Sequence, residues 1–172
     1  MNKVKIKLLL VCLFLFSSKI YAEPCKGKDN TKWNNCVGTI IYDEFRYVGE
    51  FKNGREHGFG IYYKNNKIWE AGERTGADLN GTFLNGFGTE FHDDGGKIIG
   101  EFKDGSPRGY NMDIQDNYIL IGEHGDLGLP HGYAIEFNFE TNQIYAGEWD
   151  INLFTNGNIY DLDGNFIEKY NE

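Results

Sequence analysis

The chain contains very little serine, and this scarcity narrows the enzymes it could be. Only three serines occur in 172 residues, and Ser17 and Ser18 lie close to the N-terminus. The third, Ser106, stands between Gly105 and Pro107 in a turn-like sequence and not in a Gly-x-Ser-x-Gly nucleophile elbow. A serine hydrolase is therefore not indicated.

Histidine is also scarce, and its spacing does not suit a metal site. The four histidines are His57, His92, His124 and His131, and they form neither a His-x-x-x-His nor a His-Glu-x-x-His pattern. His57 and His131 precede glycines, which indicates polar residues at hairpin entries. No pair of carboxylates is set apart from the repeated acidic positions, as the two catalytic acids of a glycosidase would be. We predict no catalytic residue, no metal and no cofactor.

Long apolar runs are absent except near the N-terminus. Lys3, Lys5 and Lys7 precede an apolar run at residues 8–16, and a small residue, Ala22, ends the segment. An apolar run of this length is too short to cross a hydrocarbon layer of about 30 Å at about 1.5 Å per residue. We predict that residues 1–22 are a cleaved signal peptide and that the protein is secreted or periplasmic.

Positive charge is in short supply after this segment. Four of the 17 basic residues lie in residues 1–22, which leaves 13 against 26 acidic residues and a net charge of −13 for residues 23–172. Nucleic-acid binding depends on a basic surface, as does attraction to anionic lipid. We therefore predict no nucleic-acid partner and no direct binding to anionic lipid.

Cysteine is limited to three residues, and Cys12 belongs to the predicted signal peptide. Cys25 and Cys36 remain, without the Cys-x-x-Cys spacing or the additional ligands that a redox or metal pair needs. In an oxidising compartment such a pair is expected to form a disulfide, which would contribute about 2 to 3 kcal/mol. We predict that it ties segment 23–36 to the first strand.

A Gly-Glu pair is the most prominent feature that the sequence does contain. It occurs five times, at intervals of 23, 28, 22 and 25 residues. A unit of this length cannot bury its own apolar face, so it must stack on its neighbours. The five pairs begin at Gly49, Gly72, Gly100, Gly122 and Gly147.

Each copy has the pattern of a β-hairpin. In residues 47–63, two runs rich in aromatic residues are separated by Asn53-Gly54, a pair that tolerates the positive φ of a hairpin turn. Asp104-Gly105 has the same place in the third copy. Further turn signals lie between the copies, which predicts an up-and-down meander.

Alternate residues of the second strand in each hairpin predict one apolar face and one small and acidic face. The glycines among them are expected to leave room for an aromatic ring on the neighbouring backbone. The apolar face is predicted to hold Phe59/Ile61/Tyr63, Phe87/Thr89/Phe91, Tyr110/Met112/Ile114, Tyr133/Ile135/Phe137 and Asn158/Tyr160/Leu162. The opposite face is predicted to hold Gly60/Tyr62, Gly88/Glu90, Asn111/Asp113, Ala134/Glu136 and Ile159/Asp161.

Stacking would also place acidic residues in two rows. Rows of like charge need a cation, a basic partner or buried donors, so two interpretations stay open: cation binding, or anchoring of turns through backbone N–H groups. One predicted row contains Glu50, Glu73, Glu101, Glu123 and Glu148, and the other Glu90, Asp113, Glu136 and Asp161.

The pattern Tyr-x-Gly-Glu-Phe-x-x-Gly-x-x-x-Gly-x-Gly-x-x-Tyr in residues 47–63 resembles the MORN (membrane occupation and recognition nexus) repeat, and the resemblance extends over about residues 36–162. It departs from the pattern at Arg74 and His124, after Gly-Glu, and at Asn111, Ala134 and Ile159, in place of a glycine. The residues that carry the resemblance are Tyr47, Gly49, Glu50, Phe51, Gly54, Gly58, Gly60, Gly72, Glu73, Gly100, Glu101, Phe102, Gly122, Glu123, Tyr145, Gly147, Glu148 and Trp149.

The resemblance implies an all-β, elongated, single-layer antiparallel meander of about five stacked hairpins in residues 37–164, with residues 165–172 as a cap or tail. It further implies a non-catalytic scaffold that binds a protein partner or a second copy. The alternative is a glycan-binding module of the cell envelope that uses exposed Trp69, Tyr145 and Trp149 beside acidic residues.

Overall fold

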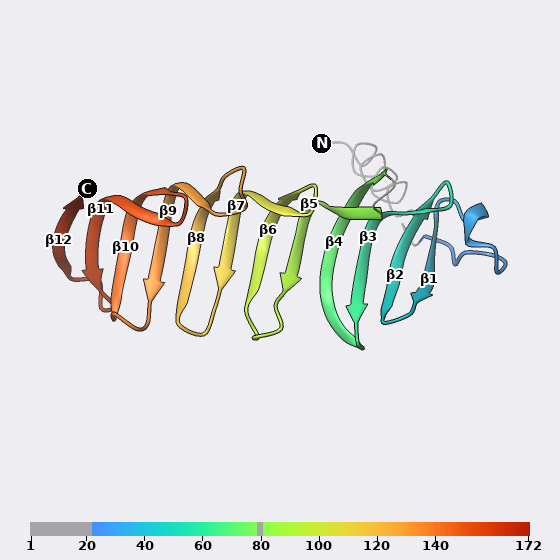
Figure 1. Ribbon diagram of the computed structural model, residues 1–172, viewed down its shortest axis with the longest axis horizontal. Coiled ribbons are helices and arrows are strands. Elements are labelled where there is room, and N and C mark those ends of the chain that lie inside the picture. Colours follow the sequence, from blue (N-terminus) through green and yellow to red (C-terminus); the bar gives the residue numbers. More distant parts are fainter. Residues whose placement is uncertain (1–21, 79–80) are drawn as a thin grey trace, which may run out of the picture.

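The computed structural model describes residues 22–78 and 81–172, so the predicted signal peptide lies outside it except for Ala22. The described residues form one antiparallel sheet in which each strand pairs with its neighbours in sequence (Figure 1). This confirms the all-β meander. The strands are β1 (Cys36–Tyr42), β2 (Phe45–Lys52), β3 (Arg55–Lys64), β4 (Lys67–Asp78), β5 (Gly81–Phe91), β6 (Lys97–Lys103), β7 (Ser106–Ile114), β8 (Tyr118–His124), β9 (Pro130–Asn138), β10 (Gln143–Asp150), β11 (Leu153–Asp161) and β12 (Phe166–Asn171).

The predicted number of about five hairpins is too low, because the sheet has twelve strands. The five Gly-Glu copies account for β2 to β11, and one additional strand flanks them on each side. The C-terminal strand, β12, covers most of the segment predicted as a cap or tail. A short 3-10 helix, η1 (Asn30–Lys32), precedes the sheet. No helix within the described ranges has the length and apolar character needed to cross a membrane.

Two of the described hairpin turns have the chemistry that the sequence predicts. Asn53 and Gly54 have φ values of 53° and 74°, and Asp104 and Gly105 have values of 51° and 81°. Both pairs are typical of the type I′ turns that match the twist of the flanking strands. The turn between β10 and β11 instead places Ile151 at a φ of 45°. A β-branched residue is rare in this conformation, so no local signal predicts it.

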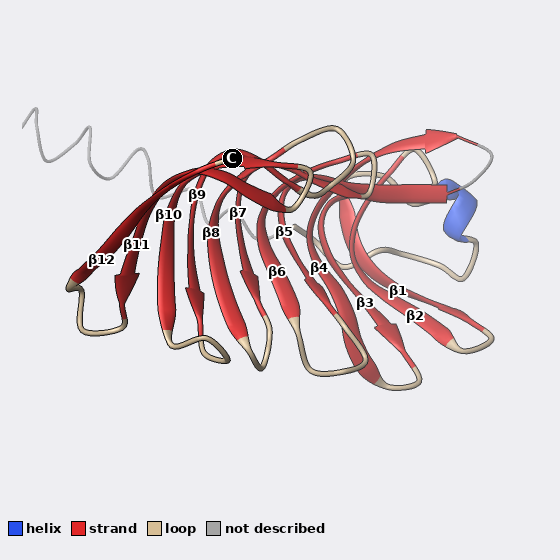
Figure 2. Ribbon diagram, turned by 60° about the vertical axis from the view of Figure 1, so that its left-hand side comes forward, coloured by secondary structure: helices blue, strands red, loops and turns tan. Residues whose placement is uncertain are grey.

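The glycines of the motif form one row across the sheet. Its positions pair directly from strand to strand and end at Tyr170 in β12. Figure 2 shows that the strands curve along their length. Side chains would converge inside this curve, since a Cβ at Gly72 would lie only 2.5 Å from the Cα of Gly88. The row from β1 to β11 is Gly38, Gly49, Gly60, Gly72, Gly88, Gly100, Asn111, Gly122, Ala134, Gly147 and Gly157.

This row corrects the predicted alignment of the fifth copy. Gly157, and not Ile159, faces Gly147. The copy is therefore shifted by two residues relative to the prediction. As a result, Ile159 takes the place predicted for Asp161 in the second acidic row, beside Tyr145.

Candidate interaction surface

The two faces of the sheet differ in burial. We call the face that carries the glycine row and the buried side chains the inner face, and the opposite face the outer face. Apart from the N-terminal segment at the first hairpin, no second layer covers the sheet over the described residues. Burial on the inner face therefore comes from side chains of neighbouring strands that pack against one another inside the curve.

The inner face is organised by the residue that follows each Gly-Glu pair. This position is between 1% and 7% exposed in every copy. Tyr47 lies beside it in the first copy, with its ring over Gly49 and Gly60. The sequence signal of an aromatic residue after Gly-Glu thus marks the core. The five residues at this position are Phe51, Arg74, Phe102, His124 and Trp149.

Arg74 is accommodated in the core by polar partners. Its guanidinium lies 2.7 Å from the Glu70 carboxylate and 4.3 Å from the centre of the Tyr62 ring. Tyr62 and Tyr42 donate hydrogen bonds to the buried Glu56. Burial and the charge of Glu56 raise the pKa of Tyr42 to about 12, and the pKa of Tyr62 is raised by the same causes, so both hydroxyls remain protonated donors.

Two further acidic residues, on β4 and β5, lie at the same level of the sheet as Tyr62. Glu70 pairs directly with Glu90 on β5. Burial, with a smaller contribution from Glu70, raises the pKa of Glu90, whereas the nearby His92 opposes this shift. Like charges in directly opposed positions are unfavourable, so the Arg74 cation is important to this part of the sheet.

His124 has no comparable set of partners. Its Nδ1 lies 3.4 Å from the carbonyl oxygen of Gly122, and burial lowers its pKa. The folded protein therefore holds a neutral imidazole, while the unfolded chain takes up a proton below its ordinary pKa of 6.5. Stability due to this group is present above that pH and is lost as the pH falls below it.

We expect His124→Phe to raise the free energy of unfolding by about 1 kcal/mol at pH 7, because the buried polar ring is replaced by the apolar ring found at Phe51 and Phe102. The advantage should grow between pH 7 and pH 5, since phenylalanine does not titrate. Urea unfolding at both pH values measures the effect, and His131→Phe at an exposed position is the control. An unchanged pH dependence would contradict this explanation.

The Gly-Glu pair itself marks a bulge. The carboxylate of Glu50 lies over Gly58, where a Cβ would collide with it, and accepts the backbone N–H of Phe59 at 3.3 Å. Gly58 has a φ of 64°, which favours glycine. Equivalent pairs are Glu73 with Gly86, Glu101 with Gly109, and Glu123 with Gly132. Register shifts occur between Gly49/Phe51, Gly72/Arg74, Gly100/Phe102, Gly122/His124 and Glu148/Trp149.

These contacts favour one of the two interpretations of the first acidic row. The structure places all five glutamates on the outer face at one level of the sheet, as the sequence predicts. Glu50 anchors the backbone through a hydrogen bond. The carboxylates of Glu73, Glu101 and Glu123 fill the space above a glycine, and the Glu148 carboxylate accepts a hydrogen bond from the Asn156 amide at 3.4 Å. The described part of the chain contains no group of His, Cys, Asp or Glu arranged to hold a metal ion.

Aromatic rings alternate with these glutamates along the outer face. Phe59 pairs with Glu73, and Phe87 pairs with Glu101. Tyr110 and Glu123, and Tyr133 and Glu148, make the same pairs further along the sheet. Each of the four rings is at least 60% exposed. We call this line of four rings and five glutamates the ring–glutamate row.

The predicted apolar stripe therefore lies on the outer face, and the core lies on the other. A second outer row, next to the ring–glutamate row, is also largely apolar. Sequence alternation separated the two faces correctly in the first four copies. The second outer row contains Val48, Ile61, Ala71, Thr89, Ile99, Met112, Ile121, Ile135 and Ala146.

The aromatic residues expected to bind a glycan occupy different surroundings. Trp149 is buried, with its ring centre 5.4 Å from that of Phe154. Tyr145 packs against the same cluster. Trp69 is partly exposed and lies 5.5 Å from the Phe45 ring. The three residues form no common exposed platform.

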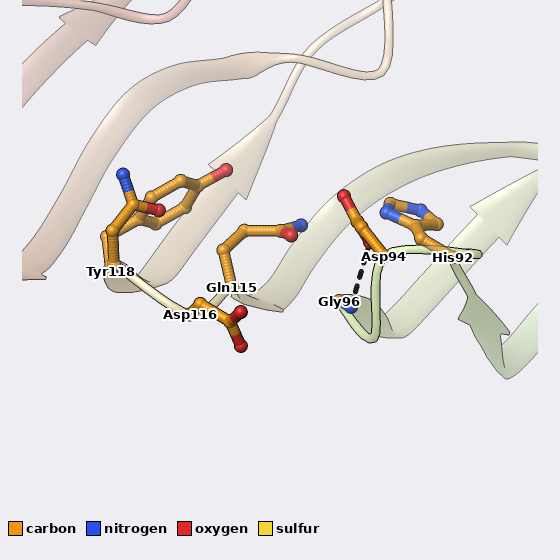
Figure 3. A pocket seen from close by; sticks show the side chains of 7 residues that line it. His92, Asp94, Gly96, Gln115, Asp116 and Tyr118 are labelled. Carbon is orange, nitrogen blue, oxygen red and sulfur yellow. Dashed lines mark hydrogen bonds between the residues drawn. The ribbon is translucent and has the colours of Figure 1, made fainter.

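A polar hollow of about 370 Å³ lies at the hairpin edge between β5 and β8 (Figure 3). Asp94 accepts the backbone N–H of Gly96 at 3.0 Å. Tyr118 and Gln115 both donate to Asp113 nearby. The side chains around the hollow thus stabilise its turns, and none is paired as a nucleophile with a base.

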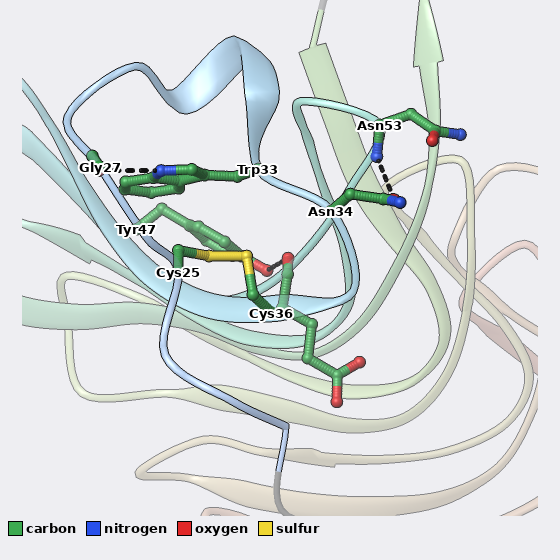
Figure 4. Close-up of a disulfide and its surroundings, with 8 residues drawn as sticks. Cys25, Gly27, Trp33, Asn34, Cys36, Tyr47 and Asn53 are labelled. Carbon is green, nitrogen blue, oxygen red and sulfur yellow. Dashed lines mark hydrogen bonds between the residues drawn. A yellow bond between two sulfur atoms is a disulfide. The ribbon is translucent and has the colours of Figure 1, made fainter.

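The N-terminal segment covers the first hairpin. Cys25 and Cys36 form the predicted disulfide (Figure 4). Trp33 packs edge-on against Phe51, with ring centres 4.9 Å apart. Gly54 donates its N–H to the Trp33 carbonyl at 2.7 Å. Gly105 makes the same bond to a residue of the preceding hairpin, Leu84, at 2.9 Å. The segment thus takes the place of a preceding repeat.

Comparison with known proteins adds no assignment. No protein-family model matches the chain, and no curated protein matches it. The resemblance to the MORN repeat therefore depends on the motif itself.

Proposed function

We propose that this protein is a non-catalytic scaffold of the MORN type, secreted or periplasmic, that binds another polypeptide or a second copy of itself through its outer face. The observation that supports this proposal is the ring–glutamate row on a single-layer sheet. Four rings that are mostly exposed and regularly spaced, beside a second apolar row, form a continuous patch of the kind that marks interaction sites.

A polypeptide partner suits this patch better than a glycan does. The second outer row is largely aliphatic, and aliphatic side chains gain most by packing against other apolar side chains. A sugar ring would use only the aromatic faces. The acidic charge of residues 23–172 also disfavours anionic glycans.

Site-specific photocrosslinking tests the proposed surface. We expect p-benzoylphenylalanine at Phe87 to form a discrete adduct with a polypeptide in the cells that produce the protein. The same group at Leu153, which is equally exposed but lies outside the row, is the matched control. Light scattering over a range of concentrations shows whether the partner is a second copy. Adducts that form equally at both positions, or quenching by an oligosaccharide instead, would contradict the proposal.

A further inference from the structure

The ring–glutamate row has a composition that favours a cationic ligand. Phe87 lies between Glu73 and Glu101, and Tyr110 lies between Glu101 and Glu123, in the order of the strands. No basic residue occupies this level of the sheet from Val37 on β1 to Asn171 on β12. An ammonium or guanidinium group over such a ring gains from the ring quadrupole and from the carboxylates on both sides. A neutral ligand gains only from contact with the ring.

The spacing of the rings selects the conformation of the ligand. The rings lie on β3, β5, β7 and β9, so successive rings are two strands, about 9.6 Å, apart. Side chains on one face of an extended strand repeat every two residues, or about 6.7 Å, and this distance does not match the spacing of the rings. A polyproline II helix has three residues per turn and repeats each face after about 9.3 Å.

An α-helix gives a poorer match. Its nearest repeat on one face is seven residues, or about 10.5 Å. Over the three intervals between four rings, the mismatch is about 3 Å for the α-helix and about 1 Å for polyproline II. A polyproline II segment also loses little entropy on binding, because its conformation is already common in the free chain.

We propose that the ring–glutamate row binds a basic polypeptide segment in the polyproline II conformation, with a lysine or arginine at every third residue. This inference rests on the proposed function and specifies its partner. The segment crosses the strands, and each cationic side chain lies over one ring beside a carboxylate.

Fluorescence anisotropy with a labelled (Lys-Pro-Pro)4 peptide tests this assignment. We expect saturable binding that weakens as salt is added, since exposed charges are screened. A peptide of the same composition with its four lysines consecutive should bind at least about tenfold more weakly, and (Glu-Pro-Pro)4 should not bind.

Two double variants test whether the peptide binds at the ring–glutamate row. Phe87→Ala combined with Tyr110→Ala should weaken binding by about tenfold or more, because it removes both central rings. Leu127→Ala combined with Leu153→Ala removes equally exposed apolar side chains outside the row and should leave binding unchanged. Circular dichroism and the melting temperature confirm that both variants are folded.

Three results would overturn the inference. Equal binding of the two lysine peptides, with no effect of ring removal, would indicate non-specific attraction of charge. Tighter binding of a helical peptide with a lysine at every seventh residue would show that the conformation is wrong. Absence of peptide binding, together with a polypeptide adduct at Phe87, would reject the basic ligand but not the scaffold function. Absence of the adduct would reject the scaffold function itself.

Discussion

Gly60→Ala should lower the free energy of unfolding by about 3 kcal/mol or more. A Cβ at this position would point into the ring of Tyr47, closer than side chains can approach. Tyr47 cannot move away, because it is fully buried between the rings of Phe51 and Tyr62, at 5.4 and 5.1 Å, and its hydroxyl donates to the Glu50 carbonyl at 3.1 Å.

The midpoint of urea unfolding measures this loss, and Gly164→Ala is its control. Gly164 has a positive φ of 88°, which Gly60 does not share, but a Cβ there meets no atom within 4 Å. That variant should cost only about 1 kcal/mol of backbone strain. Tyr47→Ala should remove most of the penalty of Gly60→Ala in a double-mutant cycle. Fully additive losses would show that the ring and the glycine are not coupled.

The local parts of the fold were predictable from the sequence. Asn53-Gly54 and Asp104-Gly105 specify type I′ turns through the conformations those residues tolerate, and the repeated Gly-Glu pair gives the length of the unit. Signals of this kind act over a few residues, so they do not depend on tertiary structure. Cys25 and Cys36 were likewise paired by elimination.

The position of the core was not predictable in the same way. Alternation separates two faces, but the curvature of the sheet decides which face becomes buried. The fifth copy has a single glycine where the pattern has Gly-x-Gly. Taking Gly157 for the first of the two glycines placed Ile159 in the glycine row that Gly157 occupies. The ring–glutamate row also went unrecognised, since Phe59 and Glu73 lie on different strands and meet only through the register.

Arg74→Phe should lower the free energy of unfolding by about 3 kcal/mol, although it introduces the aromatic residue that the repeat pattern has after Gly-Glu. His124→Phe, at the equivalent position of the fourth copy, is expected to have the opposite effect. The difference lies in the partners. Arg74 bonds to Glu70 and stacks on Tyr62 beside the buried Glu56, so its removal leaves acidic groups in the core without this cation.

A double variant separates charge from packing at Arg74. Combining Arg74→Phe with Glu70→Gln should recover at least about half of the lost stability, because the partly buried Glu70 charge is removed together with its partner. If Arg74→Phe instead stabilises the protein, as His124→Phe should, the explanation is wrong. The inner face would then need only apolar contact at this position, and the polar cluster around Glu56 would not need the Arg74 cation.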